Sequence, residues 1–355
     1  FGCGPSKVRP EAVVALAEAG RTYLGTSHRQ AGVRSVVGRL REGLSELFGL
    51  PGGWEILLGN GGSTQFWDMA AFGLINSRSQ HLVFGEFSSK FAQAVKAAPH
   101  LGEPEVLEVT PGSHPLPKPS EGVDSYAFTH NETSTGVAMP LRRVVPAEEA
   151  LVLVDATSAA GGLAWEPAEV DVYYFAPQKC FASDGGLWVS ACSPAAIERI
   201  ERISASGRWV PGSLDLKIAL DNSRLDQTNN TPALATLFLF QNQVRWMLDN
   251  GGLEWCVKRC QTSSSILYSW AEAASYAAPF VADTAMRSDV VGTIDLEGVD
   301  ANEVAKVLRQ NGIVDTESYR KLGRNQLRIG MFPAIDPDDV AALTRCIDYV
   351  VAALS

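Results

Sequence analysis

The sequence predicts an α/β protein with a large domain built on a mainly parallel, seven-stranded sheet and a smaller α+β domain after it. Short apolar runs alternate with helical stretches through the first two-thirds of the chain. Runs such as Leu151–Val154 are continuously apolar, which is typical of strands that helices cover on both faces. After Pro232 the pattern changes to two long helices and a strand–helix–strand–helix succession. A chain of 355 residues is long enough for two domains, since single cores stop growing beyond roughly 250–300 residues.

Short segments rich in β-branched and aromatic residues predict the strands of the large sheet. They are Trp54–Leu58, His81–Gly85, Val106–Val109, Ser125–Thr129, Ala150–Asp155, Val172–Phe175 and Gly186–Cys192. Helical patterns lie between several of them, at Val36–Phe48, Thr64–Leu74, Ser88–Ala98 and Pro194–Ser204. In such sheets, ligands bind at the carboxyl ends of the strands, so polar residues at those ends are the candidates for function.

The last third of the chain predicts the smaller domain. Ala233–Asp249 and Leu253–Ala274 form two helical patterns, and the glycines between them indicate a helix stop. The strand–helix–strand–helix succession then occupies Val290–Leu296, Ala301–Gln310, Gln326–Met331 and Asp336–Ala353.

Composition narrows the class of partner. The chain is 46% hydrophobic and 20% charged, which is ordinary for a globular protein, and its formal charge of −10 argues against a nucleic-acid partner. Without an apolar stretch of ~20 residues or a secretory leader, we expect no membrane partner and a cytoplasmic location. The six cysteines form no C-x-x-C pair, so we expect reduced thiols and no metal site.

Two residues at predicted strand ends carry the chemistry. Asp155 directly follows an apolar strand, and Lys179 follows the next strand along the chain. A partly desolvated lysine loses its proton more easily and becomes a nucleophile toward carbonyl groups. A carboxylate beside a pyridine nitrogen keeps that nitrogen protonated, which makes the ring an electron sink. This pair therefore predicts pyridoxal phosphate (PLP) catalysis.

A glycine-rich turn upstream predicts the site of the cofactor phosphate. Leu58-Gly-Asn-Gly-Gly-Ser-Thr-Gln-Phe66 joins a predicted strand to a helix. Free N–H groups at the start of a helix point toward an anion, so Ser63 and Thr64 are candidates to bind the phosphate. Such turns are common in α/β proteins, so this turn indicates a phosphate site only in combination with Asp155 and Lys179.

Five motifs in order resemble the phosphoserine aminotransferases, a branch of the fold-type I, class-V aminotransferases. They are Gly25-Thr-Ser-His-Arg29, His130-Asn-Glu-Thr-Ser-Thr-Gly136, Asp155, Gln178-Lys179 and Asn230-Thr-Pro232. The resemblance runs from Gly4-Pro5 to the final helix and is closest to the actinobacterial form.

The resemblance implies the fold and the reaction. The fold would be PLP fold-type I, with a large domain of residues 15–235 and a small domain of residues 1–14 and 236–355. The reaction would be reversible amino transfer from glutamate to 3-phosphohydroxypyruvate, giving O-phosphoserine and 2-oxoglutarate, in serine biosynthesis. Phosphohydroxythreonine, in pyridoxine biosynthesis, would be a second substrate.

The resemblance also implies roles for individual residues around the cofactor. Lys179 would hold PLP covalently and transfer the proton, Asp155 would pair with the ring nitrogen, and Thr133 would donate to the phenolic oxygen. The remaining cofactor contacts would be Phe87, stacked on the ring where most members have tryptophan, and Gln178, Ser63 and Thr64 at the phosphate. Asn230 and Thr231 would reach that phosphate from the neighbouring subunit, which implies a homodimer with shared active sites.

Substrate choice depends on cations, because phosphoserine brings a carboxylate and a phosphate. The candidates that the resemblance implies are Arg328 for the carboxylate and His28, Arg29 and Arg320 for the phosphate. Tyr319 stands where many members have histidine, and Lys321 and Arg324 are cations that could compensate for it.

Two other hypotheses stay open at this stage. One is another class-V enzyme, either a serine/alanine–glyoxylate aminotransferase or a cysteine desulfurase, although desulfurases usually carry histidine where Gln178 stands. Cys180 replaces the asparagine usual after the lysine, and we interpret it as a small buried residue. The other hypothesis is a non-catalytic relative with the same fold, which would have lost part of the Lys–Asp–Thr set.

Overall fold

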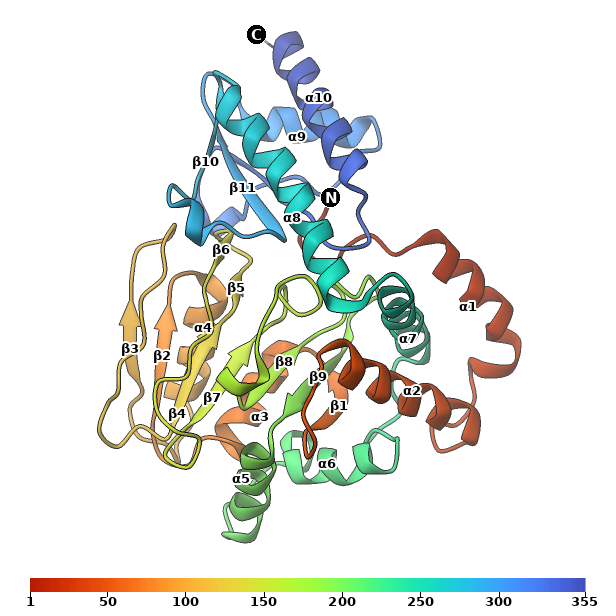
Figure 1. Ribbon diagram of the computed structural model, residues 1–355, viewed down its shortest axis with the longest axis vertical. Coiled ribbons are helices and arrows are strands. Elements are labelled where there is room, and N and C mark those ends of the chain that lie inside the picture. Colours follow the sequence, from red (N-terminus) through yellow and green to blue (C-terminus); the bar gives the residue numbers. More distant parts are fainter. Residues whose placement is uncertain (355) are drawn as a thin grey trace.

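The computed structural model describes residues 1–354 and contains a seven-stranded sheet with a three-stranded sheet beside it (Figure 1). The strand order of the large sheet is β1-β9-β8-β7-β4-β2-β3. Four neighbouring pairs are parallel, and β9 runs antiparallel to both β1 and β8. Its strands are β1 (Glu55–Gly61), β2 (Ser79–Val83), β3 (Glu105–Glu108), β4 (Ser125–Thr129), β7 (Leu151–Asp155), β8 (Val172–Phe175) and β9 (Gly186–Cys192).

Helices cover both faces of this sheet, which is why its central strands are continuously apolar. In β7, Val152 and Val154 belong to one buried cluster with α2 and α7, whereas Leu151 and Leu153 belong to a second cluster with α3 to α6. Successive side chains of a strand point to opposite faces, so each face receives every second residue. The helices are α2 (Ala31–Leu47), α3 (Ser63–Gly73), α4 (Glu86–Lys96), α5 (Pro194–Ala205), α6 (Leu216–Arg224) and α7 (Leu234–Asp249).

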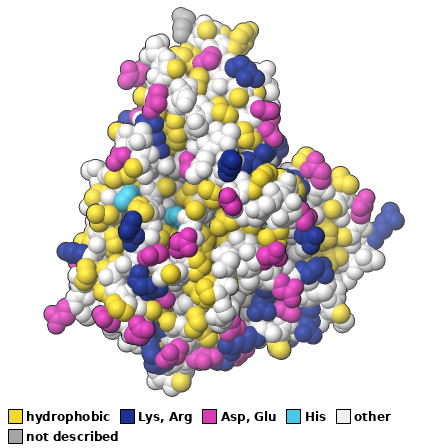
Figure 2. Space-filling view, in the orientation of Figure 1, with side chains coloured by type: hydrophobic (Ala, Val, Ile, Leu, Met, Phe, Trp, Pro, Cys, Tyr) yellow, Lys and Arg dark blue, Asp and Glu magenta, His cyan; other side chains and the backbone are white. Residues whose placement is uncertain are grey.

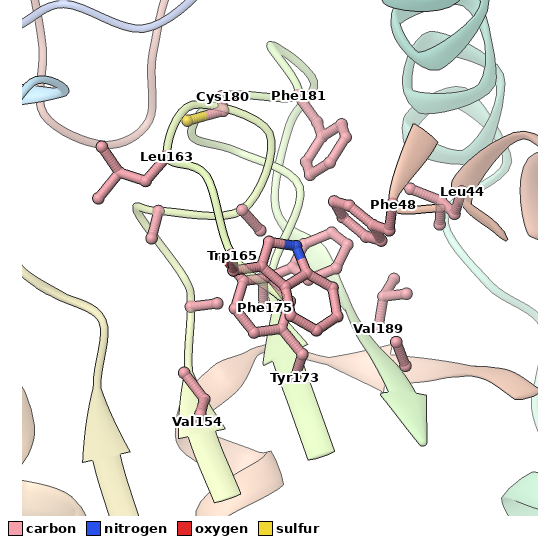
Figure 3. Packing of buried hydrophobic residues seen from close by; sticks show 14 of the residues in the cluster. Leu44, Phe48, Val154, Leu163, Trp165, Tyr173, Phe175, Cys180, Phe181 and Val189 are labelled. Atoms are coloured by element: carbon pink, nitrogen blue, oxygen red, sulfur yellow. The ribbon is translucent and has the colours of Figure 1, made fainter. Parts of the chain in front are cut away.

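Aromatic side chains pack closely beneath the carboxyl end of β8 (Figure 3). Trp165 stacks on Tyr173 with ring centroids 4.0 Å apart, and Phe48 meets the edge of Trp165 at 5.6 Å. Phe175 stacks on Phe181 at 4.9 Å. Large rings of this kind bury much apolar surface, so they fix the loop that follows β8 on a rigid base.

The smaller sheet lies at the other end of the molecule, beside the long helix α8 (Figure 1). It has the order β10-β11-β12 and is antiparallel. Its elements are α8 (Gly252–Ala273), β10 (Ala277–Pro279), β11 (Val291–Leu296), α9 (Ala301–Gln310), β12 (Gln326–Gly330) and α10 (Pro337–Leu354). The third buried cluster consists mostly of residues from these elements, whereas Cys256 and Cys260 of α8 and Val291 of β11 join the cluster of the large sheet.

The predicted α/β class with its mainly parallel, seven-stranded sheet is confirmed, and all seven predicted strands are present. The sequence patterns did not reveal α1 (Pro10–Tyr23), α6, β10 or the short hairpin β5–β6 (Asn131–Glu132 and Val137–Ala138). These elements are short or largely exposed, so a periodic apolar pattern is weak in them. The expected domain boundary after residue 235 falls inside α7 and stays a prediction.

The surface has no single-sign patch on the face in Figure 2, where acidic and basic side chains are interspersed. No helix within residues 1–354 is long and apolar enough to cross a membrane. The same residues contain no group of three or more His, Cys, Asp or Glu arranged to hold a metal ion.

Candidate active site

A cavity of about 370 Å³ lies at the carboxyl ends of β4, β7 and β8, where α3 begins. Seven of the residues predicted to contact the cofactor line it together. They are Ser63, Thr64, Phe87, Thr133, Asp155, Gln178 and Lys179. A larger cavity, of about 660 Å³, lies between the N-terminal segment and α10 and contains none of the predicted site residues.

Lys179 is buried at the cavity wall, four residues after the end of β8. The pKa of its amine is lowered from 10.5 to about 8, mainly by burial and to a smaller extent by the nearby Arg328 guanidinium, against an opposing effect of Cys3. The amine donates a hydrogen bond to the carbonyl oxygen of Cys3 in the N-terminal segment. A Cβ at position 4 would collide with the Lys179 side chain, so Gly4 lets the backbone pass over the amine. Lys179 can therefore be a neutral nucleophile near physiological pH.

Asp155 ends β7 and lies on the same cavity wall, fully surrounded by protein. Trp67 on α3 donates its indole N–H to Oδ2 at 3.0 Å, while the Thr157 N–H and hydroxyl donate to Oδ1 at 3.0 and 2.5 Å. Burial raises the pKa of the Asp155 carboxyl, and these donors oppose that rise. A buried carboxylate that lacks a cation is costly, so a positively charged ring nitrogen would complement it.

Thr133 and its neighbours form a connected polar wall. The Thr133 and Asn131 side chains both donate to the Ser158 hydroxyl, at 2.7 and 2.8 Å. Between them along the chain, the fully buried Glu132 accepts hydrogen bonds from the Phe87 and Ser88 backbone N–H groups at the start of α4. Glu132 thereby fixes Phe87, whose ring lines the cavity, relative to Thr133.

The start of α3 and the Gln178 amide form the candidate anion-binding end of the cavity. The first N–H groups of a helix have no intrahelical partner, and Gly62 precedes α3 in an extended conformation without a side chain. The Ser63 hydroxyl lies 2.6 Å from the Thr157 hydroxyl; because Thr157 gives its own proton to Asp155, Ser63 is the donor, and this chain of bonds ties the turn to Asp155. The buried Oε1 atom of Gln178 has no partner among the described residues, so this side chain is free to bind a ligand.

Arg328, on β12 of the small sheet, does not line the cavity but contacts Thr133, which does. Its Nη1 donates to the Thr133 carbonyl oxygen at 3.2 Å, and its guanidinium lies over the Tyr319 ring, 5.3 Å from the centroid. Neighbouring Arg324 pairs with Asp295, whereas Arg328 forms no ion pair within residues 1–354. An unpaired, half-buried guanidinium is suited to bind a carboxylate with its two parallel N–H groups.

The other predicted site residues do not line this cavity in the single chain. His28 and Thr231 contact each other at 3.2 Å, and Asn60 binds the Thr231 carbonyl at 2.8 Å. Arg29 and Asn230 are exposed, and the Arg29 guanidinium donates to Gln227 at 3.4 Å. Exposed Arg320 lies in a separate surface pocket with Arg324. Lys321 forms an ion pair with Glu86, so both cations that could compensate for Tyr319 are already paired.

Three residues of the site escaped the sequence analysis. Trp67 lies one helical turn after Ser63, and that i, i+4 spacing could have placed both side chains on one face of α3. Thr157 follows Asp155 by two residues, a spacing at which a carboxylate often bonds the local backbone. Nothing in the sequence indicated that Gly4 contacts Lys179, because the two positions lie almost half the chain apart.

Comparison with known proteins decides the family. The family model described as aminotransferase class-V matches residues 117–317, which include Thr133, Asp155 and Lys179. A phosphoserine aminotransferase of Rhodococcus jostii is 60% identical over 355 residues, covering 100% of this chain and 95% of the relative. One of Rhodococcus opacus is 59% identical with the same coverage. The chain belongs to the class-V aminotransferases. The predicted resemblance is therefore confirmed.

Solved structures show the same fold. A phosphoserine aminotransferase from Cytophaga hutchinsonii superposes with a TM-score of 0.91 at 24% identity, covering 98% of both chains. An aspartate aminotransferase from Thermus thermophilus reaches a TM-score of 0.82 at 23% identity, so the fold alone does not select a substrate.

As a class-V aminotransferase the protein is a PLP-dependent transaminase, which confirms the expected enzyme class and cofactor. Buried Lys179, Asp155 without an ion pair among residues 1–354, and the Gln178 Oε1 atom without a hydrogen-bond partner there fit that cofactor.

Proposed function

We propose that this transaminase transfers the amino group of glutamate to 3-phosphohydroxypyruvate, giving O-phosphoserine and 2-oxoglutarate. The observation that carries the proposal is that Lys179 and Asp155 line one cavity, and that Arg328 binds the carbonyl of Thr133, which also lines it. Relatives about 60% identical over the whole chain carry the name phosphoserine aminotransferase. We place the reaction in serine biosynthesis, with 4-phosphohydroxythreonine as a second substrate in pyridoxine biosynthesis.

The cofactor would be held by the cavity residues in the roles that their positions suit. Lys179 would bind it covalently, Asp155 would face the ring nitrogen, and Thr133 would donate a hydrogen bond to the phenolic oxygen. Phe87 would lie against the ring, and Ser63, Thr64 and Gln178 would bind the phosphate. When bound, PLP supplies an electron sink for negative charge at the substrate α-carbon.

Lys179 would also move the proton of the reaction. Its pKa of about 8 leaves a substantial neutral fraction near physiological pH. The amine can therefore take a proton from the substrate α-carbon and deliver it, in a 1,3-shift, to the cofactor carbon that is bonded to the same nitrogen. Burial keeps the amine out of bulk water, and the Cys3 carbonyl holds it beside the cavity.

Recognition of the substrate would be divided between Arg328 and a second set of cations. Arg328 would bind the α-carboxylate that glutamate and phosphoserine share. His28, Arg29 and Arg320 would bind the substrate phosphate, and Asn230 and Thr231 the cofactor phosphate, within a homodimer. In support, Arg29, Arg320, Asn230 and Thr231 are exposed, and none of these residues lines the chain's own cavity.

Two alternative class-V activities are less well supported. A cysteine desulfurase needs a cysteine that can reach the substrate, and no cysteine side chain lines the cavity within residues 1–354. The Cys180 thiol is buried against the Ser158 carbonyl on the core side of its loop (Figure 3). A glyoxylate aminotransferase would leave the exposed cations without a substrate group to bind.

The proposal includes a cytoplasmic location. All six cysteines are free and five of them are buried, which suits a reducing compartment.

The decisive experiment compares amino donors in single half-reactions. Glutamate or phosphoserine alone should change the absorbance spectrum of the PLP-loaded protein, while serine and alanine should act far more slowly. Borohydride reduction followed by mass spectrometry should locate the cofactor on Lys179, and Lys179→Ala should lose repeated turnover. Equal rates with serine and phosphoserine would instead favour the glyoxylate activity.

A further inference from the structure

Tyr319 lies between a residue of the cofactor wall and the candidate carboxylate-binding arginine. Its ring centroid is 6.0 Å from that of Phe87, with 55° between the ring planes. On the small-sheet side, the Arg328 guanidinium lies 5.3 Å from the Tyr319 centroid. The half-buried Tyr319 ring therefore connects the two parts of the molecule at the edge of the site.

Arg328 has few other contacts that could hold its orientation. Its Nη1 donates to the Thr133 carbonyl, and its buried Nε has no partner within the described chain. An arginine side chain has several freely rotating bonds, so an unsupported guanidinium would lose conformational entropy on binding a carboxylate. A ring that already holds the guanidinium reduces this cost, since less freedom remains to be lost.

The segment that carries Tyr319 is fixed at both ends. On one side, the Arg328 backbone N–H donates to the Thr316 carbonyl at 3.0 Å, and Glu317 forms an antiparallel bridge with Leu327. On the other side, Lys321 forms an ion pair with Glu86, the residue before Phe87. The position of the ring is thus set by contacts on both sides of the site.

We propose that Tyr319 is a positioning residue: its ring, and not its hydroxyl, holds the Arg328 guanidinium ready for the substrate α-carboxylate. This inference rests on the proposed carboxylate-binding role of Arg328. Both amino-acid substrates carry that carboxylate, so Tyr319 affects glutamate and phosphoserine alike. If the phenol bound the substrate phosphate instead, only phosphoserine would be affected.

The test compares Tyr319→Phe, which keeps the ring, with Tyr319→Leu, which removes it. For each PLP-loaded variant, KM and the limiting rate are measured in separate half-reactions with glutamate and with phosphoserine. Binding of glutarate, a dicarboxylate without an amino group, is measured by its effect on the cofactor spectrum. Arg328→Lys, which loses the forked guanidinium, is the control for loss of carboxylate binding. Thermal unfolding and the cofactor spectrum show that each variant is folded and loaded.

We expect Tyr319→Phe to leave both KM values within about twofold. Tyr319→Leu should raise both KM values and the glutarate Kd by a similar factor, about 3- to 30-fold, with little change in the limiting rates. If Tyr319→Leu does not fold, Tyr319→Met replaces it with a longer, flexible side chain that also lacks a ring.

Three results would overturn the inference. Tyr319→Phe could weaken phosphoserine alone, which would make the hydroxyl a phosphate ligand. The ring-free variants could leave both substrates unchanged, or they could lower the limiting rates without affecting KM. If the wild-type protein reacts with glutamate but not with phosphoserine, the proposed substrate is refuted. The glutamate and glutarate measurements would then still test the role of Tyr319.

Discussion

The indole Nε1 of Trp67 donates a hydrogen bond to Oδ2 of Asp155 at 3.0 Å, and both residues line the cavity. This bond joins the first turns of α3 to the carboxyl end of β7. It supports the ionised form of a carboxyl group whose pKa burial raises.

Trp67→Phe should weaken cofactor binding by about tenfold, the usual effect of losing one hydrogen bond to a charged group. Without the indole donor, the pKa of Asp155 rises further, and the carboxylate pairs less strongly with a cationic ring. Titration of the cofactor-free protein with PLP measures this. Trp165→Phe is the matched control, because the buried Trp165 Nε1 has no hydrogen-bond partner among the residues that the structure describes. Equal loss of affinity in both variants would contradict the role given to the Trp67–Asp155 bond.

Glu132→Gln should reduce the free energy of unfolding by about 1–3 kcal/mol and weaken PLP binding. The Glu132 carboxylate accepts from the Phe87 and Ser88 N–H groups and from the Ser88 and Ser134 hydroxyls. A glutamine would direct its own NH₂ group at some of these donors and leave them unsatisfied. Urea unfolding measures the stability, and the exposed Glu148→Gln serves as the control. Unchanged stability in Glu132→Gln would show that water replaces these bonds.

Lys179→Met should stabilise the cofactor-free protein at pH 7 by up to about 3 kcal/mol, because it removes a buried charge. The folded-state pKa of Lys179, about 8, is lower than the ordinary 10.5. Between these values the unfolded chain binds a proton that the folded chain does not. The contribution of Lys179 to the free energy of unfolding of the wild type therefore rises between pH 8 and pH 10.5 and is lowest below pH 8.

The advantage of Lys179→Met should accordingly shrink as the pH rises above 8. Thermal unfolding across pH 7–10 follows this trend, with exposed Lys258→Met as the control that shows no such change. A constant advantage across that range would mean that the folded and unfolded chains bind the same number of protons, so that burial does not lower the pKa of Lys179.

Mixing two inactive variants should restore activity if the active sites are shared in a homodimer. Lys179→Ala lacks the cofactor-binding amine, and Asn230→Ala combined with Thr231→Ala lacks the side chains proposed to reach the cofactor phosphate in the partner's site. Each mixed dimer would contain one intact site. Unfolding and refolding the two variants together should therefore recover about one quarter of wild-type activity. No recovery, together with a monomeric mass in solution, would refute the shared site.

Local sequence patterns predicted the seven strands of the large sheet well, because buried strands need continuous apolar runs. Asp155 and Lys179 could be paired in advance for a related reason: β7 and β8 are parallel neighbours, so their carboxyl ends meet at one edge. Trp67 was missed because its apolar ring fits the core of α3 equally well, and the sequence does not show that its N–H faces Asp155.

By itself, the sequence determined the fold class, the Lys–Asp pair and the family resemblance, since each of these depends on short segments with a regular spacing. Only the tertiary structure decided that the N-terminal segment crosses Lys179 and that Tyr319 lies between Phe87 and Arg328. These contacts join residues far apart in the chain, and they form only when the two sheets pack beside each other. Local apolar periodicity contains no information about that packing, because it reports which face of an element is buried and not which partner buries it.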